Sequence, residues 1–202
     1  MLVGKAAARC RTAALSRIYR TRSLSTNRCV DDDKLDDYSR WAAVHDKQLR
    51  EWQYEAPSVA AGLLAADSCV TPRSSAQILD VGCGTGLCGE AARAAGFGTV
   101  LGVDESPVSI AHLERIKPGL YDEVVATDID CEPLPFPADS FDGVLCVSVL
   151  SYVSSYTSIF NEWARVTRPG GLVVFTHRAW LWVRRPTSFE SARASKPQCE
   201  RA

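Results

Sequence analysis

The residues whose types and spacing point most directly to chemistry form a glycine-rich run, Asp80-Val81-Gly82-Cys83-Gly84-Thr85-Gly86, between an apolar segment and a helical one. Glycines let a backbone turn tightly and come close to a ligand. The N-terminus of the following helix offers unpaired N–H groups and the positive end of the helix dipole. The next apolar segment ends in Asp104, where an acid accepts hydrogen bonds from both hydroxyls of a ribose. The pattern therefore predicts a site for a ribose-bearing ligand.

Two ligand classes fit the glycine spacing. Gly84, Gly86 and Gly89 match the dinucleotide pattern G-x-G-x-x-G, which is a weak signal on its own. Gly82, Gly84 and Gly86 match a different pattern, G-x-G-x-G. Asp80 favours the second pattern, because a carboxylate beside the loop repels a pyrophosphate and suits a cation. We therefore predict S-adenosylmethionine, which carries an ammonium, a carboxylate and a ribose, and keep a nicotinamide dinucleotide as the weaker hypothesis.

Short β-rich segments alternate with helical ones from residue 75 onward, which is typical of βαβ units on a parallel sheet. The expected strands lie at 77–81, 99–103, 123–127, 143–150 and 172–176. The expected helices lie at 36–49, 58–66, 87–95, 107–117 and 158–167, and three prolines predict a loop at 132–139. Right-handed crossovers place helices on both faces, and ligands bind outside the carboxyl ends of the strands. The predicted fold class is α/β, a Rossmann-like doubly wound sheet.

Composition and charge bound the other possibilities. The chain has 202 residues, enough for one domain, and a formal net charge of -1. Residues 1–24 hold six basic residues and no acid, which leaves 17 basic and 24 acidic residues in the remainder. This acidic remainder disfavours nucleic acid as a partner. The sequence contains no apolar run long enough to span a membrane.

The Arg-, Ala- and Ser-rich segment 1–24 matches the composition of a mitochondrial transit peptide. We therefore expect the mitochondrial matrix as the location, with the cytoplasm as the alternative. The eight cysteines show neither a C-x-x-C pair nor zinc-ligand spacing, so we expect no metal site. His45, His112 and His177 are the three histidines, and we interpret each as structural. No catalytic residue is predicted.

Four segments, at 78–86, 102–106, 134–142 and 165–171, resemble in order and spacing the motifs of class I S-adenosylmethionine-dependent methyltransferases. The resemblance covers about residues 36–178. Within that class, the stretch from Asp37 to Pro57 is most similar to the methyltransferase-like proteins named for the Williams–Beuren region. The resemblance implies transfer of a methyl group to an unidentified acceptor, either a small molecule or a protein side chain.

The resemblance also implies which residues contact the cofactor. These residues follow a strand or belong to an amino-terminal lid: Asp80, Gly82, Cys83, Gly84, Gly86, Asp104, Glu105, Asp128, Asp130, Ser148, Tyr38 and Tyr54. Asp80 and the glycine backbone would hold the methionine part, and Asp104 the ribose. For the adenine amino group, Asp130 is preferred over Asp128 because it lies four residues before Leu134.

Three of these predictions keep an alternative open. Ser148 would face the sulfonium or the substrate, or would instead bond to backbone. Tyr38 and Tyr54 would cover the site from the lid, or would only pack against neighbouring residues.

The end of the chain departs from the family pattern. The family sheet continues after its fifth strand with a helix and two more strands, whereas no strand pattern follows Val183 here. We therefore predict a sheet truncated after strand five, whose exposed edge would pair with another chain, such as a second copy in a homodimer. The predicted organisation is a transit peptide at 1–24, a helical lid at 25–74, the cofactor-binding core at 75–178 and an irregular tail at 179–202. A catalytically silent cofactor-binding or interaction protein is the alternative function.

Overall fold

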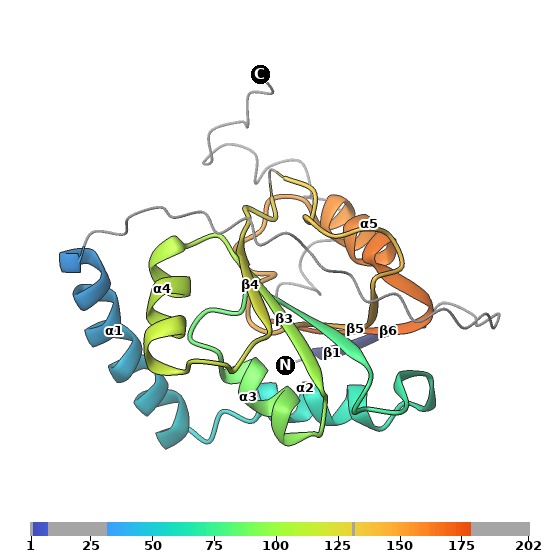
Figure 1. Cartoon of the computed structure of the whole chain (residues 1–202), viewed down its shortest axis with the longest axis horizontal. Helices are drawn as coiled ribbons and strands as arrows, with labels where there is room; N and C mark the ends of the chain where they lie inside the picture. The colour runs from blue at the N-terminus through green and yellow to red at the C-terminus, as the bar shows by residue number, and fades with distance from the viewer. Residues whose placement is uncertain (1, 8–31, 131, 179–202) are drawn as a thin grey trace.

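The computed structural model describes residues 2–7, 32–130 and 132–178, and its centre is a six-stranded sheet in the order β1-β6-β5-β2-β3-β4 (Figure 1). Strands β2 to β6 run parallel, and β1 pairs antiparallel with β6. The strands are β1 Leu2–Ala7, β2 Gln77–Val81, β3 Thr99–Asp104, β4 Glu123–Ala126, β5 Phe141–Cys146 and β6 Thr167–His177. The predicted α/β fold with five parallel strands is confirmed.

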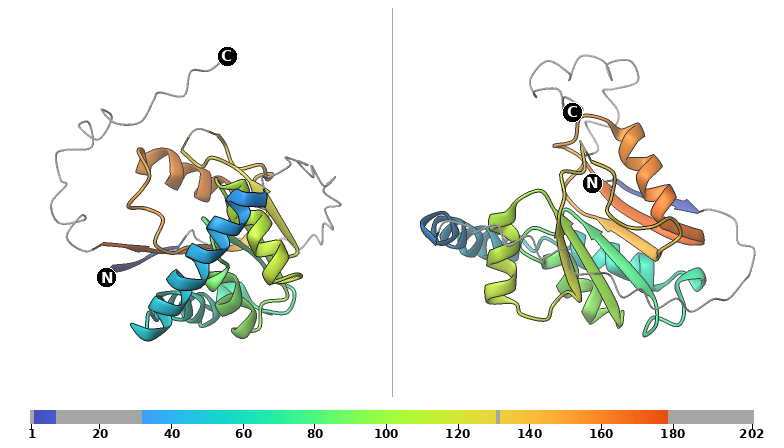
Figure 2. Two further views of the ribbon diagram at one scale, coloured as in Figure 1. Left: turned by 90° about the vertical axis from the view of Figure 1, so that its left-hand side faces the viewer. Right: turned by 45° about the horizontal axis from the view of Figure 1, so that its top comes forward.

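The described part of the chain contains five α-helices: α1 Asp32–Glu51, α2 Ala56–Ala65, α3 Leu87–Ala94, α4 Pro107–Ile116 and α5 Tyr156–Val166. A short 3-10 turn at Ser68–Val70 follows α2. Helices α2 and α5 lie on opposite sides of the sheet (Figure 2), and α1 lies beside α4 at the outside of the molecule. Within these described residues, no helix combines the length and the apolar character that crossing a membrane requires.

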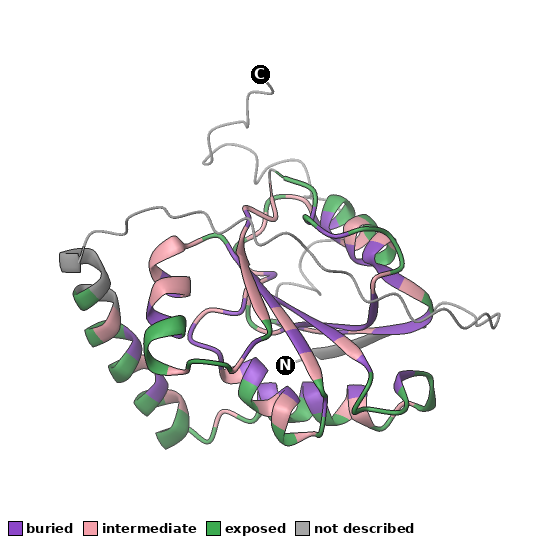
Figure 3. Ribbon diagram, in the orientation of Figure 1, coloured by how far each residue is buried: buried purple, intermediate pink, exposed green. Residues whose placement is uncertain are grey.

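Side chains from the two faces of the sheet form two separate apolar clusters. Ile78 of β2 packs with Leu64 of α2, whereas its neighbour Leu79 packs on the opposite face with Trp163 of α5. This alternation follows from the two-residue period of a strand. Figure 3 shows the result, with buried residues along the strands and exposed ones on the outer sides of the helices. Because helices cover both faces, β5 is buried along its whole length and β2 is buried from Ile78 to Val81.

The two last strands differ most from the predicted boundaries. β5 ends at Cys146, although apolar residues continue to Leu150, because the backbone leaves the sheet at Ser148 with φ +66°. β6 begins at Thr167 rather than at Leu172. The predicted Pro-Gly-Gly turn is instead an irregularity within the β5–β6 pairing, where Gly170 has φ +88°. The chain thus pairs through residues that sequence patterns assign to a turn.

Strand β1 overturns the prediction of an exposed edge on the fifth parallel strand. In the antiparallel pairing, Leu2 lies opposite His177 and Ala7 lies opposite Leu172. The unpaired N–H and C=O groups of an edge strand accept any extended segment, and here the chain's own first residues supply one. The premise of the predicted homodimer is therefore wrong for this structure.

Residues 8–24 of the predicted transit peptide and the predicted tail at 179–202 lie outside the described residues.

Candidate functional site

A cleft of about 940 Å³ lies at the carboxyl ends of the parallel strands. Its lining comes from the glycine loop after β2, the ends of β3, β5 and β6, and helix α1. The predicted residues among those lining it are Gly82, Cys83, Gly84, Asp104, Glu105, Asp130, Ser148 and Tyr54. A switch point of a doubly wound sheet is where such a cleft is expected. The structure thus brings together most of the predicted site.

The glycine loop reaches the cleft as exposed backbone. Gly82 and Gly84 have φ of +73° and +49°, and Gly86 begins α3 at φ +86°. A Cβ atom at Gly82 would lie 2.2 Å from Cγ2 of Val149, so no larger residue fits there. Nothing comes closer than 4.0 Å to the corresponding Cβ position at Gly84. A ligand can therefore approach the backbone at Gly84 directly.

The amide groups of this loop are already used inside the protein. The N–H groups of Gly82 and Cys83 donate to the Val103 carbonyl at 2.8 and 3.0 Å, and the N–H of Gly84 donates to Asp104 Oδ2 at 2.8 Å. A dinucleotide loop instead offers such groups to a pyrophosphate. The arrangement therefore disfavours the nicotinamide dinucleotide hypothesis.

Asp104 is held rigidly at the end of β3. Its Oδ1 accepts from the N–H of Ser106 at 2.9 Å, while Oδ2 accepts from Gly84. Burial raises the pKa of Asp104 above its ordinary value, and these two backbone hydrogen bonds partly counteract the increase. The carboxylate borders the cleft with its position fixed, as an acceptor for ribose hydroxyls requires.

Asp80 does not line the cleft, and its predicted contact with the cofactor stays a prediction. Its side chain is fully buried below the loop, where Oδ2 accepts a 2.6 Å hydrogen bond from the Tyr121 hydroxyl. That hydroxyl in turn accepts from the N–H of Gly89 at 3.0 Å. Burial raises the pKa of Asp80 to about 7. Asp80 therefore supports the loop and the start of α3 from beneath, because its strand position points to the α3 side of the sheet.

At the far end of the cleft, the structure separates the two competing acids. Asp130 lines the cleft, and both of its carboxylate oxygens accept from the N–H of Ser154 at 3.0 Å. Asp128 does not line the cleft, and its Oδ1 accepts from the N–H of Asp130 at 3.0 Å. Asp128 therefore shapes the turn, and Asp130 faces the cleft. Gly86, at the N-terminus of α3, is likewise outside the lining.

The opposite end of the cleft carries hydroxyl groups from three distant segments. The hydroxyls of Tyr54 and Ser148 contact each other, and the N–H of Ser148 donates to Thr176 Oγ1 at 2.9 Å. The positive φ of Ser148 is a conformation that serine rarely adopts, and such strain concentrates at functional sites. Sequence reasoning missed Thr176, which β6 brings next to the end of β5.

His177 also borders this end, but both of its ring nitrogens have partners within the protein. Nε2 lies 2.8 Å from the Tyr156 hydroxyl, and Nδ1 lies 3.0 Å from the Arg178 carbonyl. This bonding supports the structural interpretation of His177. The arrangement identifies no general base.

Helix α1 forms one wall of the cleft. Trp41, His45 and Leu49 recur every four residues, which places them on one face of the helix, and all three line the cleft. The rings of Trp41 and His45 stack with centroids 4.7 Å apart. The side chain of Tyr38 lies outside the described residues, so its predicted contact stays a prediction.

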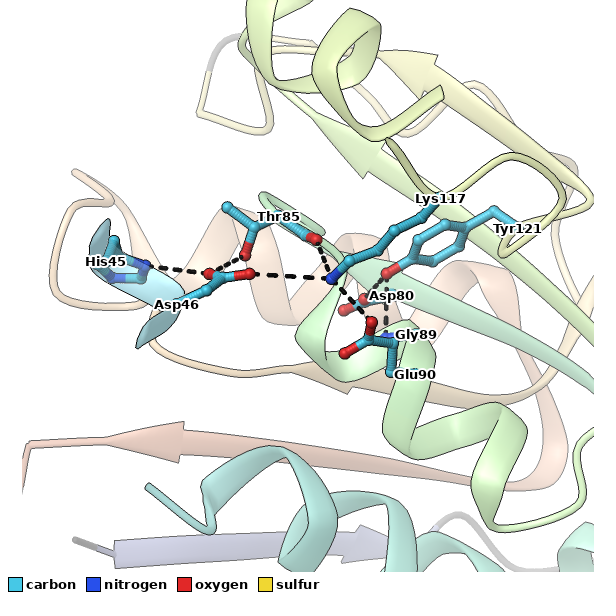
Figure 4. A network of polar contacts seen from close by, with 8 residues as sticks. All are labelled: His45, Asp46, Asp80, Thr85, Gly89, Glu90, Lys117 and Tyr121. Carbon is cyan, nitrogen blue, oxygen red and sulfur yellow. Dashed lines mark hydrogen bonds and ion pairs between the residues drawn. The ribbon is translucent and has the colours of Figure 1, made fainter. Parts of the chain in front are cut away.

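A buried polar network joins α1 to the glycine loop (Figure 4). Asp46 Oδ1 accepts from the Thr85 hydroxyl at 2.8 Å, and Lys117 Nζ donates to the Thr85 carbonyl at 2.8 Å. Lys117 also pairs with Glu90 at 2.9 Å and lies 3.8 Å from Asp46 Oδ2. Sequence reasoning missed this network, because a charged residue at the end of a helix looks like any solvated side chain.

Comparisons with known proteins identify related chains. Residues 79–175 match a family described as methyltransferase domain. Human methyltransferase-like protein 27 is 41% identical over 145 residues, covering 72% of this chain and 58% of the human protein. A ubiquinone biosynthesis O-methyltransferase of Pseudomonas syringae pv. tomato is 35% identical over 105 residues, covering 50% of this chain and 43% of that protein. This chain thus spans about half the length of these relatives.

Solved structures show the same fold. A Haloferax volcanii protein described as a methyltransferase, in complex with the Trm112 methyltransferase activator, superimposes with a TM-score of 0.55 at 23% identity. The match covers 68% of this chain and 58% of that one. A Methanococcus maripaludis protein described as S-adenosyl-L-methionine-dependent gives a TM-score of 0.54 at 15% identity, covering 68% and 62%.

Proposed function

Because residues 79–175 form a class I S-adenosylmethionine-dependent methyltransferase domain, we propose that this protein transfers the methyl group of S-adenosylmethionine to a small molecule bound in the same cleft. The single observation that carries the proposal is the division of the cleft. By the strand order, exposed loop backbone, Asp104 and Asp130 follow β2, β3 and β4 at one end, while Ser148 follows β5 at the other end, where its hydroxyl contacts that of Tyr54. The volume of about 940 Å³ is near the upper end of small-molecule sites, which leaves room for a cofactor and an acceptor.

The residues present fit the cofactor. The open Cβ position at Gly84 allows a ligand to lie against the backbone, and the fixed carboxylate of Asp104 suits ribose hydroxyls. The lining contains the acids Asp104, Glu105 and Asp130, with Arg178 as the basic residue from the described chain. This balance suits a ligand with a sulfonium and an ammonium better than one with a pyrophosphate. When bound, S-adenosylmethionine supplies an electrophilic methyl group.

The protein's own contribution to the reaction is to align the acceptor and exclude water. Trp41 and Leu49 of α1 cover the cleft from one side. Tyr54 and Ser148 offer hydroxyls that can orient a polar acceptor next to the cofactor end. Correct orientation alone can contribute several kcal/mol to lowering a barrier. A proton acceptor is needed only if the methyl acceptor must lose a proton during attack.

Phenolic hydroxyls are the acceptors to test first. The bacterial relative is named as an O-methyltransferase of ubiquinone biosynthesis, and the cleft is lined by Trp41, Tyr54 and Tyr152, on which an aromatic ring can pack.

We also propose the mitochondrial matrix as the location, on the basic composition of residues 1–24. Microscopy of the tagged full chain tests this location against a variant in which Arg17, Arg20 and Arg22 are replaced by Gln, which keeps strand β1. A cytoplasmic signal from the unsubstituted full chain would contradict the proposal.

The cofactor site is tested by calorimetric titration of the full chain with S-adenosylmethionine and S-adenosylhomocysteine. Asp104→Asn removes the charge that faces the ribose, so we expect affinity to fall about tenfold to a hundredfold. Glu114→Gln, at an exposed position of α4, is the matched control and should bind as the wild type does. Equal affinity in Asp104→Asn and wild type would overturn the assignment of this carboxylate.

Methyl transfer is tested separately with labelled cofactor and a set of phenolic, amine and thiol acceptors. Transfer to one class identifies the reaction. If the protein binds the cofactor but transfers no methyl group, either to these acceptors or to proteins of a cell extract, the enzyme proposal is contradicted. That result would favour a silent cofactor-binding protein.

A further inference from the structure

Helix α1 presents two adjacent rows of side chains, and the second row determines where the first one lies. Trp41, His45 and Leu49 line the cleft. Ala42 and Asp46, also four residues apart, form the neighbouring row and are buried, with exposed fractions of 1% and 5%. Because the two rows are on one rigid helix, a contact that fixes Asp46 also fixes the rotation of the cleft-lining row.

The shortest contact of Asp46 is a hydrogen bond to the glycine loop. The Thr85 hydroxyl donates to Oδ1 at 2.8 Å, and Thr85 lies between Gly84 and Gly86. Two other polar contacts of α1 run to α4 instead: Asp36 pairs with Arg115 at 3.0 Å, and Ser39 lies 2.8 Å from His112 Nδ1. The Asp46 contact therefore connects the helix to the loop, whereas these two connect it to α4.

Lys117 joins the loop, α1 and α3 through a single ammonium group (Figure 4). Its Nζ donates to the Thr85 carbonyl at 2.8 Å, pairs with Glu90 Oε1 at 2.9 Å and lies 3.8 Å from Asp46 Oδ2. The side chain is 17% exposed, so water screens these charges only partly. The ammonium group thus hydrogen-bonds to the loop, pairs closely with α3 and forms a longer ion pair with α1.

Without Lys117, the buried carboxylate of Asp46 would keep the Thr85 hydroxyl and the 3.4 Å contact with His45 Nδ1, but would lose the ammonium group as its counter-charge. A buried charge that loses its counter-charge is unfavourable, and the chain can relieve it by moving α1 outward into water. Such a movement would release Thr85 and open the wall formed by Trp41, His45 and Leu49. The geometry therefore couples the shape of the loop to closure of the cleft.

We propose that Asp46 and Lys117 are positioning residues that fasten α1 to the glycine loop and hold both in the shape that binds the cofactor. The inference rests on the proposed function, because it takes the loop as the place where the cofactor binds. A protein that occupies its binding-competent shape only part of the time binds more weakly by that fraction. Loss of the fastening should therefore weaken cofactor binding, although neither residue needs to touch the cofactor.

The test uses three single variants of the full chain, and a double variant and two Thr85 variants extend it. Lys117→Met keeps the aliphatic stem and removes the charge, and Asp46→Asn keeps an acceptor for Thr85 while removing the charge. Arg115→Met is the matched control, because it breaks an ion pair between α1 and α4 that does not reach the loop. Calorimetry measures S-adenosylhomocysteine affinity, and hydrogen exchange of the ligand-free chain measures opening of residues 39–51 and 82–90.

We expect Lys117→Met to weaken binding about tenfold and to speed exchange in both segments. Asp46→Asn should act in the same direction, and the double variant should lose little more than Lys117→Met, because the pair between Lys117 and Asp46 is already broken in Lys117→Met. Arg115→Met should bind within about twofold of wild type. Thr85→Val should speed hydrogen exchange in both segments, because it removes the hydroxyl. Thr85→Ser should keep the slow exchange of the wild type, because serine keeps the hydroxyl.

Wild-type affinity together with wild-type exchange in folded Lys117→Met would overturn the proposal. If Lys117→Met does not fold, Asp46→Asn decides by the same two readouts. Failure of the wild type to bind either cofactor form would instead count against the proposed function. The exchange experiment would then still decide whether the fastening exists, because it needs no ligand.

Discussion

The two ends of the cleft are built in different ways. The cofactor end comes from a continuous stretch of chain. The loop at 82–86 follows β2, Asp104 ends the adjacent strand β3, and the N–H of Gly84 donates a hydrogen bond to the Asp104 carboxylate. The acceptor end is assembled from Tyr54, Ser148 and Thr176, which are far apart in the chain and meet through side-chain hydroxyls. The first end depends on backbone shape, which glycine spacing reveals. The second depends on tertiary contacts, which spacing does not reveal.

The same contrast appears in where strain lies. At the cofactor end, positive φ values fall on Gly82, Gly84 and Gly86, which adopt them without steric cost. At the acceptor end, a positive φ falls on Ser148, where a Cβ atom makes it unfavourable. At the acceptor end, this strained backbone conformation sets the position of the Ser148 hydroxyl next to that of Tyr54.

The largest effect should come from Gly82→Ala, which tests the dependence of the cofactor end on backbone shape. The new Cβ would lie 2.2 Å from Val149 Cγ2, in addition to the unfavourable φ of +73°. We expect the free energy of unfolding to fall by about 3 kcal/mol or more, measured by denaturant titration. Cofactor affinity should fall with it.

Gly96→Ala separates the two causes. Gly96 has φ +92°, but nothing lies within 4 Å of its Cβ position. Only the backbone strain of about 1 to 2 kcal/mol should therefore appear. Equal losses in the two variants would mean that the close approach of Val149 does not matter.

The next effect concerns pH and the buried carboxyl of Asp80. Burial raises its pKa from 3.8 to about 7, so the folded chain binds this proton more tightly than the unfolded chain does. This contribution to stability is full below about pH 4 and is lost as the pH rises to about 7. Asp80→Asn resembles the protonated acid and should remove that decline, as measured by unfolding between pH 4 and 8.

Glu162 gives a control of the opposite sign on the other face of the sheet. A hydrogen bond from Arg165 lowers the pKa of Glu162, so its stabilisation is present above its ordinary pKa and is lost as the pH falls. Glu162→Gln should therefore lower the stability above about pH 4.5 and remove the loss of stability on the acid side, without changing the slope between about pH 5 and 7. If Asp80→Asn leaves the slope between pH 4 and 7 unchanged, Asp80 is not the group that titrates there.

The smallest change in stability should come from Ser148→Gly, which tests the strain at the acceptor end. Glycine accepts φ +66° freely, but it also gains freedom in the unfolded chain. We expect stability to stay equal or to rise by up to about 1 kcal/mol, while methyl transfer falls and cofactor affinity is unchanged.

Gln53→Gly is the matched comparison for that variant. Gln53 has φ +50° and does not line the cleft, so it should show the same gain in stability with normal transfer. A loss of stability in Ser148→Gly, with no loss in Gln53→Gly, would show that the serine hydroxyl supports the fold rather than the acceptor.

Much of the core follows from local sequence signals. The bounds of β2, α3, β3, α4 and β4 agree with the predicted ranges to within one residue, because glycines and prolines interrupt apolar runs there. β5 and β6 were placed less well, since the apolar run continues past Cys146 and the Gly170 region pairs instead of turning. Pairing across a bulge depends on the partner strand, which a sequence pattern does not contain.

Residue types and spacing alone predict the order of the motifs along the parallel strands, the glycine loop and the acid at the end of the next strand, because these depend on backbone freedom and strand ends. The folded structure was needed to show that Asp80 lies beneath the loop, that Asp130 rather than Asp128 faces the cleft, and that Lys117 connects α1 to Thr85. It also decided that residues Leu2–Ala7 cover the edge of β6. Each of these depends on which groups from distant segments meet, and burial and pairing energies are set only once the chain has folded.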